Sequence, residues 1–176
     1  LNINTWFVAI SATPLVILYP LAKRFTKWPQ IILGLTFSWA VPTAWSAANE
    51  EWNLGIFFMY LATVFWIIGY DTIYGCQDKN EDEIFGIKNS AVSAKNFLTL
   101  FVGCSYSLMF CLLIISGYLL NNNIFWYIGV SICGLHLANQ VRKIKNIEQN
   151  NPLQIFKSNI VLGLFLTLSS LGNHIS

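Results

Sequence analysis

The stretch Leu98–Leu120 reads LTLFVGCSYSLMFCLLIISGYLL and contains no charged residue. A helix of about 20 mostly apolar residues crosses the roughly 30 Å hydrocarbon core of a bilayer. This stretch is long and apolar enough to do so, and it forms most of a predicted transmembrane helix over Ala94–Leu120. The rest of the chain is best interpreted as the sequence of a membrane protein.

The composition of the whole chain agrees with a lipid environment. Of 176 residues, 55% are hydrophobic and only 10% are charged, whereas an ordinary globular chain carries about 25% charged residues. The net charge of +2 is too small to indicate a nucleic-acid partner. The four cysteines form no Cys-x-x-Cys motif, so neither a disulfide framework nor a zinc site is expected.

Apolar runs of spanning length recur along the chain and predict an all-α fold. We expect residues 1–176 to form a single multi-pass transmembrane helical bundle, without repeats or linkers. Six spans are predicted, over Ile3–Leu21, Pro29–Ala48, Trp52–Tyr70, Ala94–Leu120, Ile124–Val141 and Ile155–Leu171.

The basic residues sort to one side of this six-span topology. All ten fall in alternate connections or next to them, at Lys23, Arg24, Lys27, Lys79, Lys88, Lys95, Arg142, Lys143, Lys145 and Lys157. Basic loops face the cytoplasm, or the matrix in an organelle, under the positive-inside rule. The same rule places both chain ends on the opposite side.

An acidic segment follows the third predicted span. From Asp71 to Glu83 there are five acids in a chain that is otherwise nearly free of them. If the third helix continues, Asp71, Tyr74, Asp78 and Asp82 lie on one of its faces. Carboxylates one turn apart suit Mg²⁺, which is usually bound by one or two carboxylates together with substrate phosphates. A solvated acidic loop is the alternative interpretation.

A basic segment lies on the same side of the membrane. It contains Tyr19, Lys23 and Arg24, which could hold an anion opposite the carboxylates. Cations that bind phosphate, facing carboxylates that bind Mg²⁺, would form a diphosphate site. Ordinary positive-inside flanking of a span is the alternative.

Three motifs resemble those of the UbiA-type 4-hydroxybenzoate polyprenyltransferases. They occur in the family's order, and the resemblance as a whole covers the chain from Trp6 to His174. They read Tyr19-Pro-x-x-Lys23-Arg24-x-Thr26-x-x-Pro29-Gln30, then Tyr70-Asp71-Thr72-x-Tyr74-x-x-x-Asp78-x-x-x-Asp82, then Gly86-Ile87-Lys88-Asn89-Ser90-Ala91.

The resemblance implies an enzyme of ubiquinone biosynthesis that depends on Mg²⁺. Its substrates would be a polyprenyl diphosphate and 4-hydroxybenzoate, and it would lie in the bacterial inner (plasma) membrane or the mitochondrial inner membrane. By this likeness Asp78 and Asp82 bind the metal, and Asp71 and Tyr74 are catalytic. Diphosphate binding falls to Tyr19, Lys23, Arg24 and Lys88.

The chain also departs from the family pattern. The family has nine helices and an earlier Asp-rich motif, but no Asp precedes Asp71 here. The six predicted spans resemble the last six of the nine. We therefore expect a C-terminal portion of a larger prenyltransferase domain, one that is inactive by itself.

Other functions remain possible. Other prenyltransferases of the superfamily, in menaquinone, haem or chlorophyll pathways, are close alternatives, although the Tyr-Pro-x-x-Lys-Arg motif favours 4-hydroxybenzoate. A CDP-alcohol phosphotransferase would need an upstream Asp-Gly-x-x-Ala-Arg element, which this sequence lacks. A membrane transporter would use Asp71 as a coupling residue, but it would be expected to carry charged or broken sites in both halves.

Overall fold

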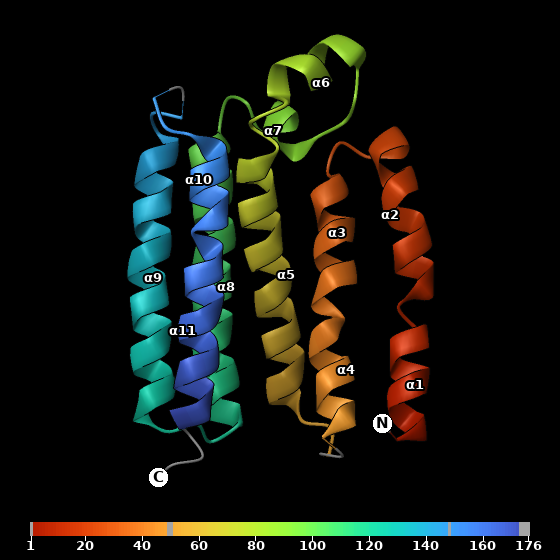
Figure 1. Cartoon of the computed structure of the whole chain (residues 1–176), viewed down its shortest axis with the longest axis vertical. Coiled ribbons are helices and arrows are strands. Elements are labelled where there is room, and N and C mark those ends of the chain that lie inside the picture. The colour runs from red at the N-terminus through yellow and green to blue at the C-terminus, as the bar shows by residue number, and fades with distance from the viewer. Residues whose placement is uncertain (1, 49–50, 148, 173–176) are drawn as a thin grey trace.

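The computed structural model describes residues 2–48, 51–147 and 149–172, and within these ranges it contains helices and no strand. The helices stand side by side in an elongated bundle (Figure 1). In chain order they are α1 (Ile3–Ile10), α2 (Thr13–Phe25), α3 (Pro29–Ser38), α4 (Ala40–Ala47), α5 (Leu54–Tyr74), α6 (Lys79–Phe85), α7 (Ser90–Ser93), α8 (Leu98–Leu119), α9 (Ile124–Ile144), α10 (Pro152–Lys157) and α11 (Asn159–Leu171).

Five segments of the described chain are long and apolar enough to cross a membrane. They are the α1–α2 pair, α5, α8, α9 and the α10–α11 pair. These five agree with predicted spans, and the all-α bundle is confirmed.

The predicted span Pro29–Ala48 differs, because it is divided into α3 and α4 and is not among those five. Pro42 has no N–H to donate to the carbonyl of Ser38, four residues earlier. The chain instead forms a tight turn, in which the amide of Trp39 donates to the carbonyl of Thr36 at 3.3 Å. The two halves nevertheless follow one another along the height of the bundle beside α5 (Figure 1).

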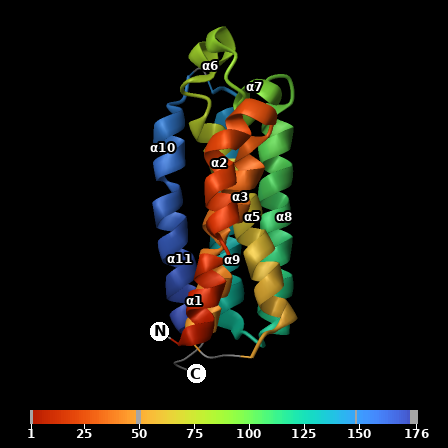
Figure 2. The same cartoon turned by 90° about the vertical axis from the view of Figure 1, so that its right-hand side faces the viewer.

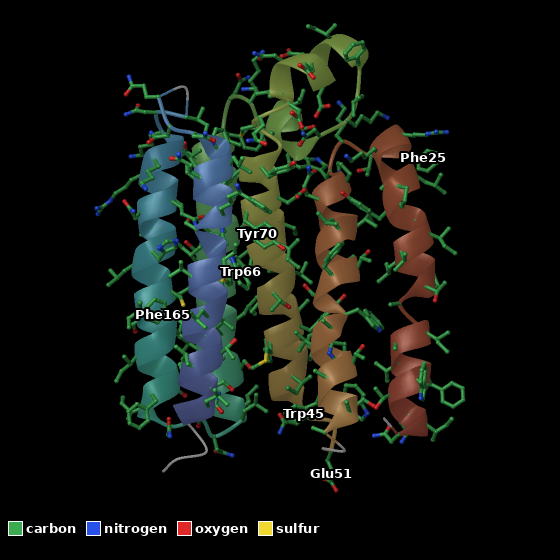
Figure 3. All side chains as sticks on the ribbon, in the orientation of Figure 1. Phe25, Trp45, Glu51, Trp66, Tyr70 and Phe165 are labelled. Atoms are coloured by element: carbon green, nitrogen blue, oxygen red, sulfur yellow. The ribbon has the colours of Figure 1, made fainter. Side chains whose placement is uncertain are left out.

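The two ends of the bundle differ in chemistry. The start of α1 and the end of α11 lie at one end, while α6 and α7 lie at the other with the C-terminal ends of α2 and α9 (Figures 1 and 2). Phe25 lies at the α6 end, and Trp45 and Glu51 lie at the opposite end (Figure 3). The connections that carry the basic residues therefore meet at one end, as the charge pattern predicts.

Close packing in the core depends on glycine at the contacts between helices. A Cβ on Gly69 of α5 would overlap the ring of Tyr106 on α8, and one on Gly117 would overlap the indole of Trp126. Small residues allow membrane helices to approach closely when no water drives their association. The α5–α8 pair consequently forms the central contact, with Val102 and Met109 fully buried beside it.

Polar side chains inside the bundle bond from one helix to the next. The hydroxyl of Tyr106 donates to Gln140 Oε1 at 2.7 Å, and Gln140 Nε2 donates to Ser158 Oγ at 2.9 Å. His136 shares the same serine oxygen at 3.0 Å. Trp66 Nε1 donates to Asn159 Oδ1 at 2.8 Å, and Trp66 lies between α5 and α11 (Figure 3). These bonds join α5, α8, α9 and the α10–α11 pair away from the acidic segment.

The close approach of α5 and α8 can be tested with a matched pair of substitutions. Gly69→Ala should destabilise the protein by about 1–3 kcal/mol, because the new methyl group overpacks the Tyr106 ring. Gly163→Ala is the control, since its Cβ would meet Trp66 at an ordinary 3.5 Å. Thermal unfolding in detergent measures both, and equal melting temperatures would contradict this account of the packing.

Candidate active site

The acidic segment does not continue helix α5, so the prediction that Asp71, Tyr74, Asp78 and Asp82 share one helical face is wrong. Helix α5 ends at Tyr74. The amides of Cys76 and Gln77 donate to carbonyls only three residues earlier, at 3.1 and 3.0 Å, and these bonds tighten the chain into a turn.

The carbonyl of Gly75 has a side-chain partner at the point where the helix ends. It accepts a hydrogen bond of 3.3 Å from the side-chain amide of Asn89, where a continuing helix would need it for the amide of Lys79. The Asn89 amide lies so close that a Cβ on Gly75 would come within 2.6 Å of its nitrogen and oxygen. Glycine at position 75 is thus required by the approach of Asn89.

The two predicted metal ligands remain together on the short helix α6. Asp78 is its N-cap residue, and the amide of Asp82 donates to the Asp78 carbonyl at 2.8 Å. Side chains four apart on a helix lie about 6 Å from one another. Asp78 is exposed, whereas Asp82 is half-buried and its Oδ2 accepts a bond of 2.8 Å from Asn89 Nδ2.

Asn89 is the centre of a buried network that links three segments of the chain. Its Oδ1 accepts from Gln30 Nε2 of α3 at 2.9 Å and from the amide of Ala91 at 3.0 Å, and so caps α7. Gln30 Oε1 in turn accepts from the amide of Ser90 at 3.0 Å. Asn89 is 8% exposed and Gln30 is 5% exposed, so these amides have protein partners in place of water.

Asp71 faces the end of α2 from inside the bundle. Its half-buried carboxylate interacts with the Gln30 side chain and with the charge of Lys23. The phenol of Tyr19, also on α2, lies near enough to feel the charge of Asp71. Tyr19 and Lys23 therefore both lie within electrostatic range of Asp71, and Gln30 lies between Asp71 and Asn89.

Two other predicted residues contact protein groups of their own. The ammonium of Lys88 donates to the carbonyls of Arg24 and Phe25 at 3.0 and 3.2 Å, which caps the C-terminus of α2. Tyr74 is 38% exposed, and its ring packs on Phe156 with centroids 4.9 Å apart. The side chain of Arg24 is exposed.

The donor set fits Mg²⁺ only as a partial site. Within the described ranges, no group of three or more His, Cys, Asp or Glu side chains comes together. Asp78 and Asp82 offer hard oxygen ligands, of which one oxygen is held by Asn89. Two carboxylates, with phosphate oxygens and water completing the shell, match the way Mg²⁺ is commonly held.

Sequence reasoning missed the two amide side chains that organise this region. Gln30 and Asn89 both fall inside the quoted motifs, but their side chains are uncharged and no role was predicted for them. The sequence signal that could have identified them is a polar side chain directly beside an apolar span. Such a side chain is expected to be buried, and a buried polar group needs a hydrogen-bond partner. Thr72 gives the same signal, and its hydroxyl lies 2.6 Å from that of Ser90.

The hydrogen-bond network around Asn89 predicts that removing this one side chain destabilises the fold. Asn89→Ala should lower the free energy of unfolding by about 1–3 kcal/mol, because it leaves buried partners such as Gln30 Nε2 and the Gly75 carbonyl unsatisfied. The control is Asn96→Ala, which alters an exposed asparagine in the same loop region. If both variants melt at the same temperature in detergent, the network does not stabilise the fold.

Cys76, in the turn after α5, gives a prediction that depends on pH. Burial raises the pKa of its thiol to about 11, although the charge of nearby Lys79 opposes the rise. Because the thiolate is the reactive form, the rate of alkylation by iodoacetamide should stay low at pH 8 and increase up to about pH 11. The protein for this test carries serine at the other three cysteines, Cys104, Cys111 and Cys133.

A control for this measurement moves the thiol by one position. Cys76→Ser combined with Gln77→Cys places it on an exposed residue of the same turn, where the midpoint should lie near the ordinary value of about 8.5. If the alkylation rates of the two proteins depend on pH in the same way, burial does not raise the pKa of the Cys76 thiol.

Comparison with known proteins places this geometry in context. The model of the UbiA prenyltransferase family matches residues 1–168. The chain is 37% identical to a mitochondrial 4-hydroxybenzoate polyprenyltransferase from Dictyostelium discoideum, over 96% of this chain and 36% of that protein. It is 36% identical to a 4-hydroxybenzoate octaprenyltransferase from Francisella tularensis subsp. novicida, over 99% of this chain and 62% of the relative.

A third relative, the 4-hydroxybenzoate octaprenyltransferase of Salmonella paratyphi B, is 33% identical over 96% of this chain and 58% of its own length. The chain thus spans between 36% and 62% of the length of these relatives. No solved structure matches it significantly. Because the family match covers nearly all of the sequence, the chain belongs to the UbiA prenyltransferase family.

Proposed function

We propose that this chain forms part of a polyprenyltransferase that attaches a polyprenyl group to the ring of 4-hydroxybenzoate, a step in ubiquinone biosynthesis. The names of the relatives support this substrate pair. The structural observation that carries the proposal is the arrangement at one end of the bundle. There Asn89 binds both Asp82 of α6 and Gln30 of α3. The neighbouring Lys88 binds the carbonyls at the basic end of α2, and Asp71 interacts with the charge of Lys23 on that helix.

In the proposed site, Asp78 and Asp82 would hold Mg²⁺ where the diphosphate of the donor binds. A bound Mg²⁺ would supply positive charge that neutralises the diphosphate and makes it a better leaving group. Asn89 fixes one oxygen of Asp82 and leaves the other free. Lys23 and Arg24, both exposed at the end of α2, bind the phosphate oxygens by charge-assisted hydrogen bonds, and Tyr19 adds a hydroxyl.

Lys88 has a different place in this scheme from Lys23. Two of its three ammonium protons are directed at the end of α2. We propose that it acts on the diphosphate mainly by holding α2, and therefore Arg24, in position. Its third proton remains available for a phosphate oxygen.

The transfer exchanges one bond for another. The C–O bond between the first prenyl carbon and the diphosphate breaks, and the electron pair leaves with the diphosphate. The ring carbon beside the phenolic hydroxyl bonds to the allylic carbon, and that ring carbon then loses its proton to the released diphosphate, which restores the aromatic ring. Asp71 orients the acceptor or polarises its hydroxyl, while the rings of Tyr70, Tyr74 and Phe156 exclude water from the cation.

The proposed location is an energy-converting membrane. Relatives come from bacteria and from a mitochondrion, so the bacterial plasma membrane and the mitochondrial inner membrane both fit. The spanning helices would let a donor with a long isoprenoid chain reach the site from the bilayer, with the charged end of the bundle facing the cytoplasm or matrix.

The proposal is tested in a version of the protein as long as its relatives. Asp78→Asn and Asp82→Asn should each reduce prenylation of 4-hydroxybenzoate at least about 100-fold, because the charge that holds Mg²⁺ is lost. Asn at position 82 keeps an oxygen that can accept from Asn89, so the fold should survive. The measurement is product formation in membranes at saturating Mg²⁺.

Glu81→Gln is the matched control. It removes one carboxylate from the same helix, at an exposed side chain, and should leave the rate within about twofold of the starting protein. Near-normal turnover of the Asp78→Asn protein, or an equal loss in the Glu81→Gln protein, would show that the acidic residues merely solvate the loop.

A further inference from the structure

A long groove lies between α8 and α9, on elements that contribute nothing to the candidate active site. Its volume is about 1210 Å³. Much of its lining consists of small residues, among them Gly103, Cys104, Ser107 and Gly134. Two cations, Arg142 and Lys145, line one end.

The groove is deep where α8 lacks a side chain. A Cβ on Gly103 would touch only Val141, at 3.7 Å, so the space above this glycine is open. On the facing helix, Gly134 packs against the ring of Phe110, which a Cβ would approach to 2.8 Å. The floor is therefore formed by small groups and one aromatic wall, a shape suited to a flexible hydrocarbon chain.

The length of the groove matches one leaflet. Along α8 its lining runs from Thr99 to Cys111, which at 1.5 Å per residue corresponds to about 18 Å. Half of the hydrocarbon core is about 15 Å thick. A chain that starts at the charged end would consequently reach the middle of the bilayer.

Within the described part of the chain, the charged end of the groove has no counter-charge. Arg142 and Lys145 make no hydrogen bond or ion pair through their side chains with the described part of the chain, unlike Lys95, which pairs with Glu83 at 3.0 Å. They lie at the end of α9 that shares the basic side of the bundle (Figure 1). Basic pockets between membrane helices on this side bind anionic lipid headgroups.

We propose that the α8–α9 groove binds one anionic phospholipid of the leaflet on the basic side. Its phosphate lies between Arg142 and Lys145, and one acyl chain follows the groove past Gly103 toward Cys111. Positive-inside flanking explains why cations occur near this surface. The added observation is that two cations, neither paired with a residue that the structure describes, line the mouth of a groove of acyl-chain length. The proposal is independent of the prenyl-transfer function.

The test is native mass spectrometry of the purified 176-residue chain, titrated with phosphatidylglycerol or phosphatidylcholine that carry the same acyl chains. One phosphatidylglycerol should bind about tenfold more tightly than phosphatidylcholine. Arg142→Gln with Lys145→Gln should abolish that preference. Lys143→Gln, which removes a charge from the same turn on the side that faces His136, should preserve it. Equal loss in the Lys143→Gln protein would overturn the proposal.

A second variant fills the groove and keeps its charges. Gly103→Leu extends into the open space above α8, and it should weaken the binding of both lipids about tenfold while far-UV circular dichroism stays unchanged. Unaltered lipid binding would mean that the acyl chain lies elsewhere. A dimer that excludes lipid and is dispersed by Gly103→Leu would assign the groove to a second copy and would also overturn the proposal.

Discussion

The hydrogen bonds of the Asn89 side chain are the constraint on which the functional end of the molecule depends. One amide group contacts the end of α5, the start of α7, a glutamine of α3 and a carboxylate of α6. Each partner is a group that would be costly to bury alone. Because all are satisfied by the same residue, the turn after α5, the direction of α6 and the distance to α3 are set together.

The sequence predicted the bundle well, because apolar runs and charge sorting both report directly on the bilayer. The sequence did not predict where helices are interrupted. Pro42 divides the expected span Pro29–Ala48, an effect that a count of apolar residues cannot detect. The acidic residues after Tyr74 kept helical spacing, yet Asn89 captures the carbonyl of Gly75 from fourteen residues away. A contact at that separation has no signature in a local pattern.

The same distinction applies to the site residues. Charged candidates were found because charges are rare in this chain, and Lys23 and Asp71 do interact electrostatically across α2 and α5. The residues that hydrogen-bond around them, Gln30 and Asn89, were not predicted. Both are neutral, and their hydrogen bonds form only when the helices are packed. Lys88 illustrates a third case: its charge was conspicuous, and the structure directs it to the end of a helix.

Helix α6 buries none of its side chains within the described structure, and beyond its own turns its side chains are tied to the bundle by Asp82–Asn89 and Glu83–Lys95. Local opening of such an element exposes almost no additional apolar surface, so we expect its amides to exchange with solvent faster than those of α5 and α8, which carry many buried side chains. The two carboxylates thus lie at the start of a helix, and within it, that no buried side chain of its own holds in place. A ligand that bridges the two carboxylates would also order that helix. The conformational entropy lost in this ordering would reduce the favourable free energy of binding and lower the affinity.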